Sequence, residues 1–86
     1  MFDFDWDDGN WPKCGKHGLT KTEIEAAFGA PSARFILVEH KTEERWMLVA
    51  FSNGRWMNVI FTRRRGAVRP ISAKPMHLRD VLRHVT

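Results

Sequence analysis

Five basic side chains crowd one short stretch of the chain, and their chemistry suits the binding of phosphate. Segment 61–74 reads FTRRRGAVRPISAK and carries Arg63, Arg64, Arg65, Arg69 and Lys74. A glycine separates two runs of strand-forming residues, so the segment is predicted to form a hairpin. Guanidinium groups bind phosphate through paired N–H donors, whereas like charges facing each other across a hairpin are destabilising. The sequence therefore predicts an anion between these arginines, and side chains that splay into water are the alternative.

The pairing within this hairpin depends on the length of its turn. A turn centred on Gly66 places Arg63 opposite Arg69, whereas a loop one residue longer places Arg64 opposite Arg69. The sequence alone does not fix this register. In both cases two guanidinium groups come close together on one face of the sheet.

Two adjacent residues near the amino-terminal end could transfer protons or bind phosphate. An unperturbed imidazole titrates near pH 6.5, so His17 is the first candidate for proton transfer. A loop histidine that caps a backbone group is the alternative. Lys16 beside it would bind phosphate, or its charge would lower the pKa of His17.

Strand residues supply further candidates for contact with a polyanion. Arg45 is a candidate phosphate ligand on a sheet face, and a salt bridge to Glu43 or Glu44 is the commoner explanation. Trp46 and Trp56 lie on two strands that are predicted to be neighbours. Aromatic rings amid basic residues can stack on unpaired bases. Burial of both rings in the core is the favoured interpretation.

The sequence does not predict a metal site. Cys14 and His17 have C-x2-H spacing, but no second pair of ligands at a suitable distance completes a zinc site. His77, Asp80 and His84 share one stripe of a predicted helix, and the solvent-facing side of an amphipathic helix explains them. An acid–base pair or a weak metal site is the alternative, although helical ligation normally uses histidines four residues apart. His77 stays a candidate for anion contact because it follows the basic segment closely.

The elements that must position these side chains alternate as in an α+β domain. Segment 2–7 alternates aromatic residues with aspartates, which is typical of a short half-buried strand, and the following loop allows at most one helical turn. The remaining elements are predicted as a helix at 20–29, strands at 33–40, 44–52, 55–63 and 67–73, and a helix at 77–85. We therefore expect an antiparallel sheet of four or five strands with helices packed on one face, and the other face free to bind a partner.

Three local signals support this assignment. Thr20 and Glu23 have the spacing of a capping box at a helix start. The pair 53–54 is Asn-Gly between two apolar runs, which is the strongest short hairpin signal. Pro70 has no backbone donor, so its strand is expected at a sheet edge or with a bulge.

Composition narrows the protein class. The 86 residues, 43% of them hydrophobic, fit one folded domain over 1–86. One cysteine allows no intrachain disulfide, and neither a membrane-spanning run nor a signal peptide is recognisable, so a cytoplasmic location is expected. Formal charge is segregated: residues 1–12, 13–54 and 55–86 carry −4, +1 and +7. This segregation favours a polyanion partner over a merely solvated surface.

Several motifs in order resemble the BrnT family of toxins from bacterial toxin–antitoxin pairs. They are WDDGNWPKCGKHG at 6–18, a capped helix, ERW at 44–46, FTxR at 61–64 and RPISAK at 69–74. The resemblance spans nearly the whole chain. It implies a RelE-like α+β fold, ribonuclease activity without a cofactor, and neutralisation by a BrnA-like antitoxin in a two-plus-two assembly.

The resemblance selects Arg64 over Arg63 as the functional member of the arginine triplet. Metal-independent cleavage uses the 2′-oxygen of the RNA as nucleophile, so the protein must move protons and stabilise charge at phosphorus. We expect Arg64, Arg69 and Lys74 to stabilise that charge and His17 to move the proton. The expected RNA contacts are Lys16, Arg45, Arg63 and His77.

The chain also departs from the family pattern. Pro12 interrupts a helix that the family has, Lys74 replaces an arginine, and Asp80 and His84 stand where the family often has Glu and Tyr. A toxin fold that binds nucleic acid without cleaving it is therefore one alternative. A pure protein-interaction module is another.

Overall fold

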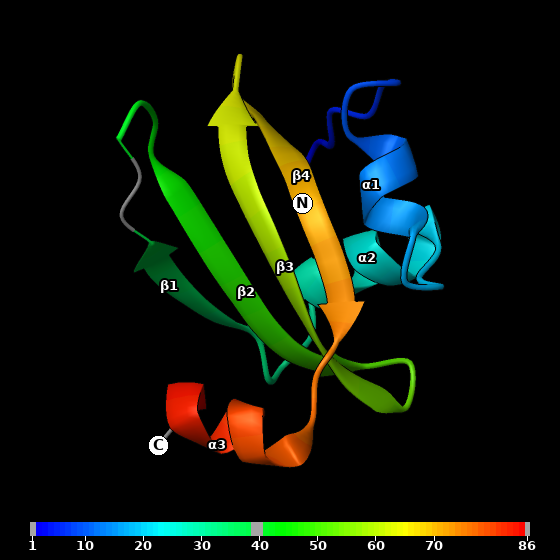
Figure 1. The fold of residues 1–86 in the computed structure, drawn as a ribbon, viewed down its shortest axis with the longest axis vertical. Helices are drawn as coiled ribbons and strands as arrows, with labels where there is room; N and C mark the ends of the chain where they lie inside the picture. Colours follow the sequence, from blue (N-terminus) through cyan, green and yellow to red (C-terminus); the bar gives the residue numbers. More distant parts are fainter. Residues whose placement is uncertain (1, 39–40, 86) are drawn as a thin grey trace.

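The chain folds as an α+β structure with one antiparallel sheet. A computed structural model describes the backbone of residues 2–38 and 41–85, and the side chains among these up to residue 83. Its elements are α1 (Trp11–Gly15), α2 (Lys21–Phe28), β1 (Arg34–Val38), β2 (Arg45–Ser52), β3 (Arg55–Arg64), β4 (Ala67–Pro75) and α3 (Leu78–Val85). The four strands lie in the order β1-β2-β3-β4 (Figure 1). The predicted fold class is confirmed. Among the described residues, no helix is long and apolar enough to cross a membrane.

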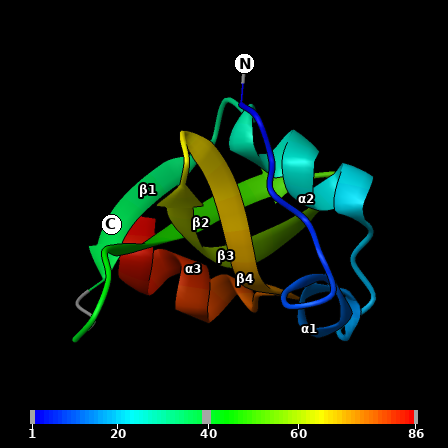
Figure 2. The ribbon, with the colours of Figure 1, turned by 90° about the horizontal axis from the view of Figure 1, so that it is seen from above.

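The amino-terminal segment lies along the outer edge of β4 (Figure 2). Instead of the strand predicted at 2–7, the segment forms a single parallel bridge between Phe4 and Val68. The Asp5 N–H donates to the Val68 carbonyl, and the Val68 N–H donates to the Asp3 carbonyl, each at 2.8 Å. The segment thus satisfies part of an edge that would otherwise expose unpaired backbone groups.

The local signals at α2 and at the first hairpin are confirmed. The Glu23 N–H donates to the Thr20 hydroxyl at 3.1 Å, and the Thr20 N–H donates to the Glu23 carboxylate at 3.0 Å. Asn53 and Gly54 have φ values of 54° and 79°, so both central residues of the turn are left-handed. This is the two-residue geometry that Asn-Gly favours.

The β3–β4 hairpin has a register that differs from both predicted alternatives. Its turn consists of Arg65 and Gly66, with φ values of 54° and 80°. Arg63 therefore lies opposite Val68, and Thr62 lies opposite Arg69. The predicted pairing of two arginines is wrong, because it assumed that a glycine alone would supply the left-handed conformation. A non-glycine residue with positive φ is uncommon, so sequence reasoning had no basis for placing Arg65 in this conformation.

A bulge restores the alignment further along the same hairpin. The register shifts between Ile60 and Phe61, so that Ile60 lies opposite Ser72 and Phe61 lies opposite Pro70. β4 is also the edge strand of the sheet. Both expectations for Pro70, an edge position and a bulge, are thus confirmed.

The main core lies between the sheet and the first two helices. Ile24 and Phe28 of α2 pack in one cluster with Leu48 of β2 and with the buried face of β3. Val49 and Val81 are also buried but lie outside that cluster. Figure 2 shows α3, which carries Val81, on the side of the sheet away from α2. The expected one-sided helical layer therefore describes α1 and α2, while α3 covers an apolar spot on the other face.

Candidate functional site

Two aspartates of the amino-terminal segment hold the two arginines that the sequence singled out. The Arg69 guanidinium makes two hydrogen bonds to the Asp7 carboxylate, each of 3.0 Å. The Arg64 Nε donates to Asp5 at 2.7 Å, and its Nη2 donates to Asp7 at 3.3 Å. The anion predicted between the arginines is therefore supplied by the chain itself.

The hairpin register brings the two arginines together. Arg69 lies opposite Thr62, and Arg64 lies opposite Ala67, so the two arginines are diagonal neighbours on one face. Residues two apart on a strand point to the same face, whereas Arg63 between them points to the other. The side chain of Arg63 pairs with Glu44 at 3.0 Å.

The segment that carries the aspartates is fixed by one buried amide. The Asn10 side chain is 3% exposed and donates to the carbonyls of Asp5 at 2.9 Å and Pro70 at 2.8 Å. It also accepts a hydrogen bond of 2.8 Å from the Asp7 N–H. The Gly9 N–H donates to the Asp7 carboxylate at 2.8 Å. These contacts orient the carboxylates toward the hairpin before any ligand binds.

The aspartate contacts change the charge behaviour of the site. Hydrogen bonds from Arg69 and then from the Gly9 backbone lower the pKa of Asp7 from 3.8 to about 2. The same carboxylate raises the pKa of Arg69. Asp7 is therefore ionised at every pH at which the protein is expected to work.

Arg64 and Arg69 differ in how many of their N–H donors remain accessible to a ligand. The side chain of Arg69 is 15% exposed, whereas that of Arg64 is 48% exposed. A guanidinium has five N–H donors, and the aspartates engage two of those on Arg64. Arg64 therefore presents donors to solvent, while Arg69 acts chiefly as part of the frame.

These side chains line an open cavity of about 340 Å³, which we call the arginine cavity. Besides Arg64 and Arg69, its lining includes Lys13, Glu43 and Arg45. The Arg45 Nε donates to the Glu43 carboxylate at 2.9 Å. The sequence predicted either a phosphate ligand or a salt bridge at Arg45, and the salt bridge is confirmed at the cavity wall.

Four of the predicted residues do not line the arginine cavity. Lys16 and His17 are exposed in the turn that follows α1. Lys74 shares a face with Arg69, but it pairs with Asn58, four β3 residues from Thr62. That offset is about 13 Å along the strand.

His77 lies at the start of α3, where its carbonyl accepts hydrogen bonds from the N–H groups of Asp80 and Val81. It is exposed, and the catalytic or binding roles of all four residues stay predictions. The side chain of His84, which shares the predicted stripe, lies outside the described residues.

Other residues in the site were missed by sequence reasoning. Lys13 lies within the motif at 6–18, and Glu43 was considered only as a salt-bridge partner of Arg45, so neither was predicted to take part in the chemistry. The aspartates had a signal, because Asp5 and Asp7 alternate with aromatic residues and must share one side of an extended segment. Thr62 also had one, as a polar residue in an apolar strand, and its hydroxyl donates to the Glu44 carbonyl at 2.6 Å.

The cysteine and the tryptophans have structural roles. Cys14 is fully buried, and this burial raises the pKa of its thiol to about 11. Trp46 packs against the core and donates its indole N–H to Glu44 at 2.9 Å, and Trp56 packs on Phe51 at 5.6 Å. Within the described part of the chain, no three His, Cys, Asp or Glu residues gather as metal ligands.

Comparison with known proteins identifies one match. A family model described as "Ribonuclease toxin, BrnT, of type II toxin-antitoxin system" matches residues 6–80. No curated protein and no solved structure matches the chain. The matched range contains Asp7, the whole sheet and every residue that lines the arginine cavity.

Proposed function

The chain belongs to the BrnT family of ribonuclease toxins, and on this premise we propose that it is an endoribonuclease that cleaves RNA at the arginine cavity. Membership of a type II toxin–antitoxin family implies a protein antitoxin as partner. Cleavage of cellular RNA would inhibit growth until a BrnA-like antitoxin neutralises the toxin.

The observation that carries this proposal is the state of Arg64. Its guanidinium is half exposed in an open cavity, and two carboxylates hold it in one orientation. Positive charge that is oriented before the reaction stabilises a developing phosphorane without a reorganisation cost. Arg64 therefore contacts the scissile phosphate, and Asp5 and Asp7 are positioning residues.

The reaction needs no metal, because the nucleophile is part of the substrate. The 2′-oxygen attacks phosphorus, its proton passes to a base, and the bond from phosphorus to the 5′-oxygen breaks. Glu43 lines the cavity and accepts the proton in this scheme, while the Lys13 ammonium protonates the departing 5′-oxygen. The products are a 2′,3′-cyclic phosphate and a 5′-hydroxyl. His17 is the alternative base.

A second candidate function is RNA binding without cleavage. Two features favour it: among the described residues no histidine lines the arginine cavity, and Arg45, Arg64 and Arg69 are each paired with a carboxylate. A binding module of this kind would show salt-dependent affinity for RNA and would leave the RNA intact.

The first experiment measures RNA cleavage in EDTA by the wild type, Arg64→Ala and Arg83→Ala. Arg83 is a matched control, because its side chain is 76% exposed on α3 and its removal changes the net charge equally. We expect Arg64→Ala to lower the cleavage rate about 100-fold or more and Arg83→Ala to leave it within about twofold. Equal cleavage by both variants would contradict the site. Binding without cleavage by the wild type would support the second candidate function.

A second experiment identifies the proton acceptor. Loss of a general base lowers the rate by about 10²–10⁴-fold. We expect that loss in Glu43→Gln and near wild-type cleavage in His17→Gln. The reverse result would assign the base to His17 and would move the reacting group toward the turn after α1.

A further inference from the structure

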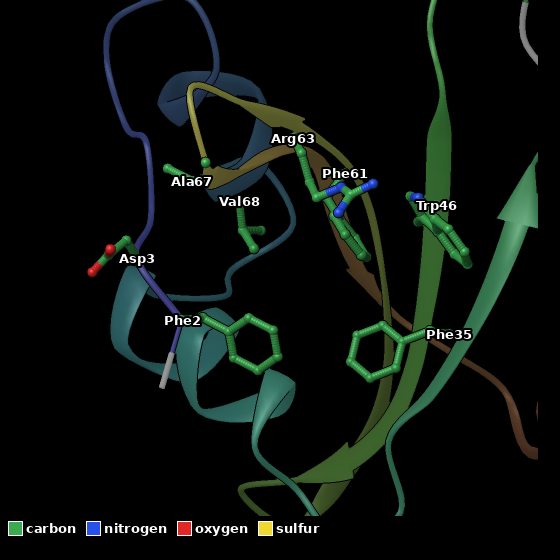
Figure 3. A pocket seen from close by; sticks show the side chains of 9 residues that line it. Phe2, Asp3, Phe35, Trp46, Phe61, Arg63, Ala67 and Val68 are labelled. Atoms are coloured by element: carbon green, nitrogen blue, oxygen red, sulfur yellow. The ribbon is translucent and has the colours of Figure 1, made fainter.

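A second open cavity lies on the opposite side of β3 from the arginine cavity. It measures about 470 Å³, and we call it the aromatic cavity because Phe2, Phe35, Trp46 and Phe61 line it. Phe2 and Phe35 are 45% and 42% exposed, and their ring centroids are 6.4 Å apart. Figure 3 shows these rings around the hollow, with the Arg63 guanidinium near Phe61 and Trp46. No residue of the proposed reaction lines it.

The two cavities are connected around the tip of the β3–β4 hairpin. A third shallow hollow shares Thr62 and Arg63 with the arginine cavity, and it shares Arg63 and Gly66 with the aromatic cavity. The alternation of a strand explains this path, since Arg63 and Arg64 are consecutive but point to opposite faces. An extended ligand could therefore contact Arg64 at one end and the aromatic rings at the other.

The chemistry of the aromatic cavity suits a nucleobase. Exposed bases of single-stranded RNA are recognised by stacking on aromatic side chains and on the plane of an arginine guanidinium. The side chain of Arg63 is 66% exposed, so it can also donate to a base or to the adjoining phosphate. Glu44 in the connecting hollow already accepts hydrogen bonds from Arg63 and Trp46, at 3.0 and 2.9 Å. Asp3 lines the far rim, and Figure 3 shows its carboxylate directed away from the rings.

From this arrangement we infer that the aromatic cavity binds an unpaired base of the RNA strand whose phosphate contacts Arg64. This inference rests on the proposed function, because the arginine cavity must bind RNA for the strand to reach the rings. It assigns the choice of nucleotide beside the scissile bond to Phe2, Phe35 and Arg63. An apolar side chain of a protein partner is the competing occupant. The exposed Arg63 guanidinium at the rim and the continuity with the arginine cavity favour the base.

The test measures binding of a fluorescent single-stranded RNA in which every 2′-oxygen is methylated, so that cleavage is blocked. Phe35→Leu removes a ring from the aromatic cavity but keeps an apolar side chain there. Phe51→Leu is the matched control, because Phe51 is 46% exposed and packs on Trp56, outside the cavity. We expect Phe35→Leu to weaken binding about fivefold to tenfold and Phe51→Leu to leave it within about twofold.

A second probe separates stacking from loss of shape. With an RNA of the same length that lacks bases, the wild type and Phe35→Leu should bind equally, because no ring can stack on a missing base. Equal weakening with both RNAs would overturn the inference and indicate a distorted fold. Equal affinity of wild type and Phe35→Leu for the complete RNA would also overturn it and assign the rings to a protein contact.

A measurement on the wild type avoids any folding defect of a variant. Trp46 lines the aromatic cavity and donates its indole N–H to Glu44 in the connecting hollow, whereas Trp56 lies outside both. On addition of the methylated RNA, the Trp46 indole NMR signal should shift and the Trp56 signal should not. An unshifted Trp46 with intact Arg64-dependent binding would overturn the base site alone. Absence of any RNA binding would overturn the proposed function with it.

Discussion

The two sides of the β3–β4 hairpin use the same residue type in different ways. On one side, Arg64 and Arg69 are held by Asp5 and Asp7 in a polar cavity. On the other side, Arg63 lies at the rim of an aromatic cavity and pairs with Glu44. The consecutive side chains of Arg63 and Arg64 therefore point to different faces of the sheet, although Arg63 also lines part of the arginine cavity. A run of arginines in a strand should be divided by face before it is counted as one basic patch.

The arginines on the two sides also differ in whether their charge is held in one orientation or is exposed to solvent. Arg69 donates two hydrogen bonds to Asp7 and its side chain is 15% exposed, so its charge is largely neutralised in place. Arg63 is 66% exposed, and its partner Glu44 is also half exposed. A catalytic contact requires a fixed geometry, whereas a recognition contact can tolerate a mobile side chain.

The largest expected effect concerns how much side chains on the two faces of β3 contribute to the stability of the fold. Phe61 is 5% exposed and packs edge to face against Phe28 with a centroid distance of 5.0 Å. We expect Phe61→Ala to lower the free energy of unfolding by about 3–5 kcal/mol. Thr62→Val on the other face should cost about 1 kcal/mol, because it removes one hydrogen bond to the Glu44 carbonyl. Urea denaturation measures both, and equal costs would show that the core extends equally to both faces.

The next effect tests the positioning role of Asp7. In Asp7→Asn the carboxylate that orients Arg64 and Arg69 is lost, and its negative charge no longer offsets the charge of the two guanidinium groups. We expect kcat for RNA cleavage to fall about tenfold, with no rise in KM, because orientation matters more in the transition state than in binding. Asp80→Asn on α3 is the control and should change neither constant. A higher kcat in Asp7→Asn would instead mean that the aspartate blocks the site.

Acid should abolish the difference in stability between the wild type and Asp7→Asn. The pKa of Asp7 is lowered from 3.8 to about 2, so its ionised form stabilises the fold above pH 4. That contribution is lost as the pH falls through about 2, because the carboxylate then protonates in the folded state as well. The stability of the wild type should therefore approach that of Asp7→Asn between pH 4 and pH 2. A gap that persists at the acid end would contradict the assigned shift.

The smallest effect concerns the two hairpin turns, which have nearly the same geometry. Asn53 and Arg65 each have a φ of 54° and each precede a glycine. Asparagine adopts this left-handed conformation at lower cost than arginine. Arg65→Asn should raise the free energy of unfolding by about 0.5 kcal/mol, and Asn53→Arg should lower it by a similar amount. Thermal unfolding of the pair checks this, and changes of the same sign would refute it.

The sequence by itself determined the local elements of the fold. The capping box at Thr20 and the Asn53–Gly54 turn form as predicted, because each depends on residues within a few positions of one another. From α2 to α3 the order of helices and strands followed from periodicity for the same reason, whereas the alternation at 2–7 predicted a strand that forms only one bridge. The motifs also sufficed to suggest the family, since they preserve residue type and spacing without reference to the fold.

Only the tertiary structure decided which side chains share a site. Asp7 and Arg69 are 62 positions apart, and their contact depends on the segment that lies along β4. Because Arg65 is left-handed, the strand pairing between the turn and the bulge differs by one residue from the pairing predicted for a turn centred on Gly66. Because side chains alternate along a strand, this register decided that Arg64, and not Arg63, shares a face with Arg69. Local signals cannot specify such long-range contacts, since their free energy arises when the sheet and the amino-terminal segment pack together.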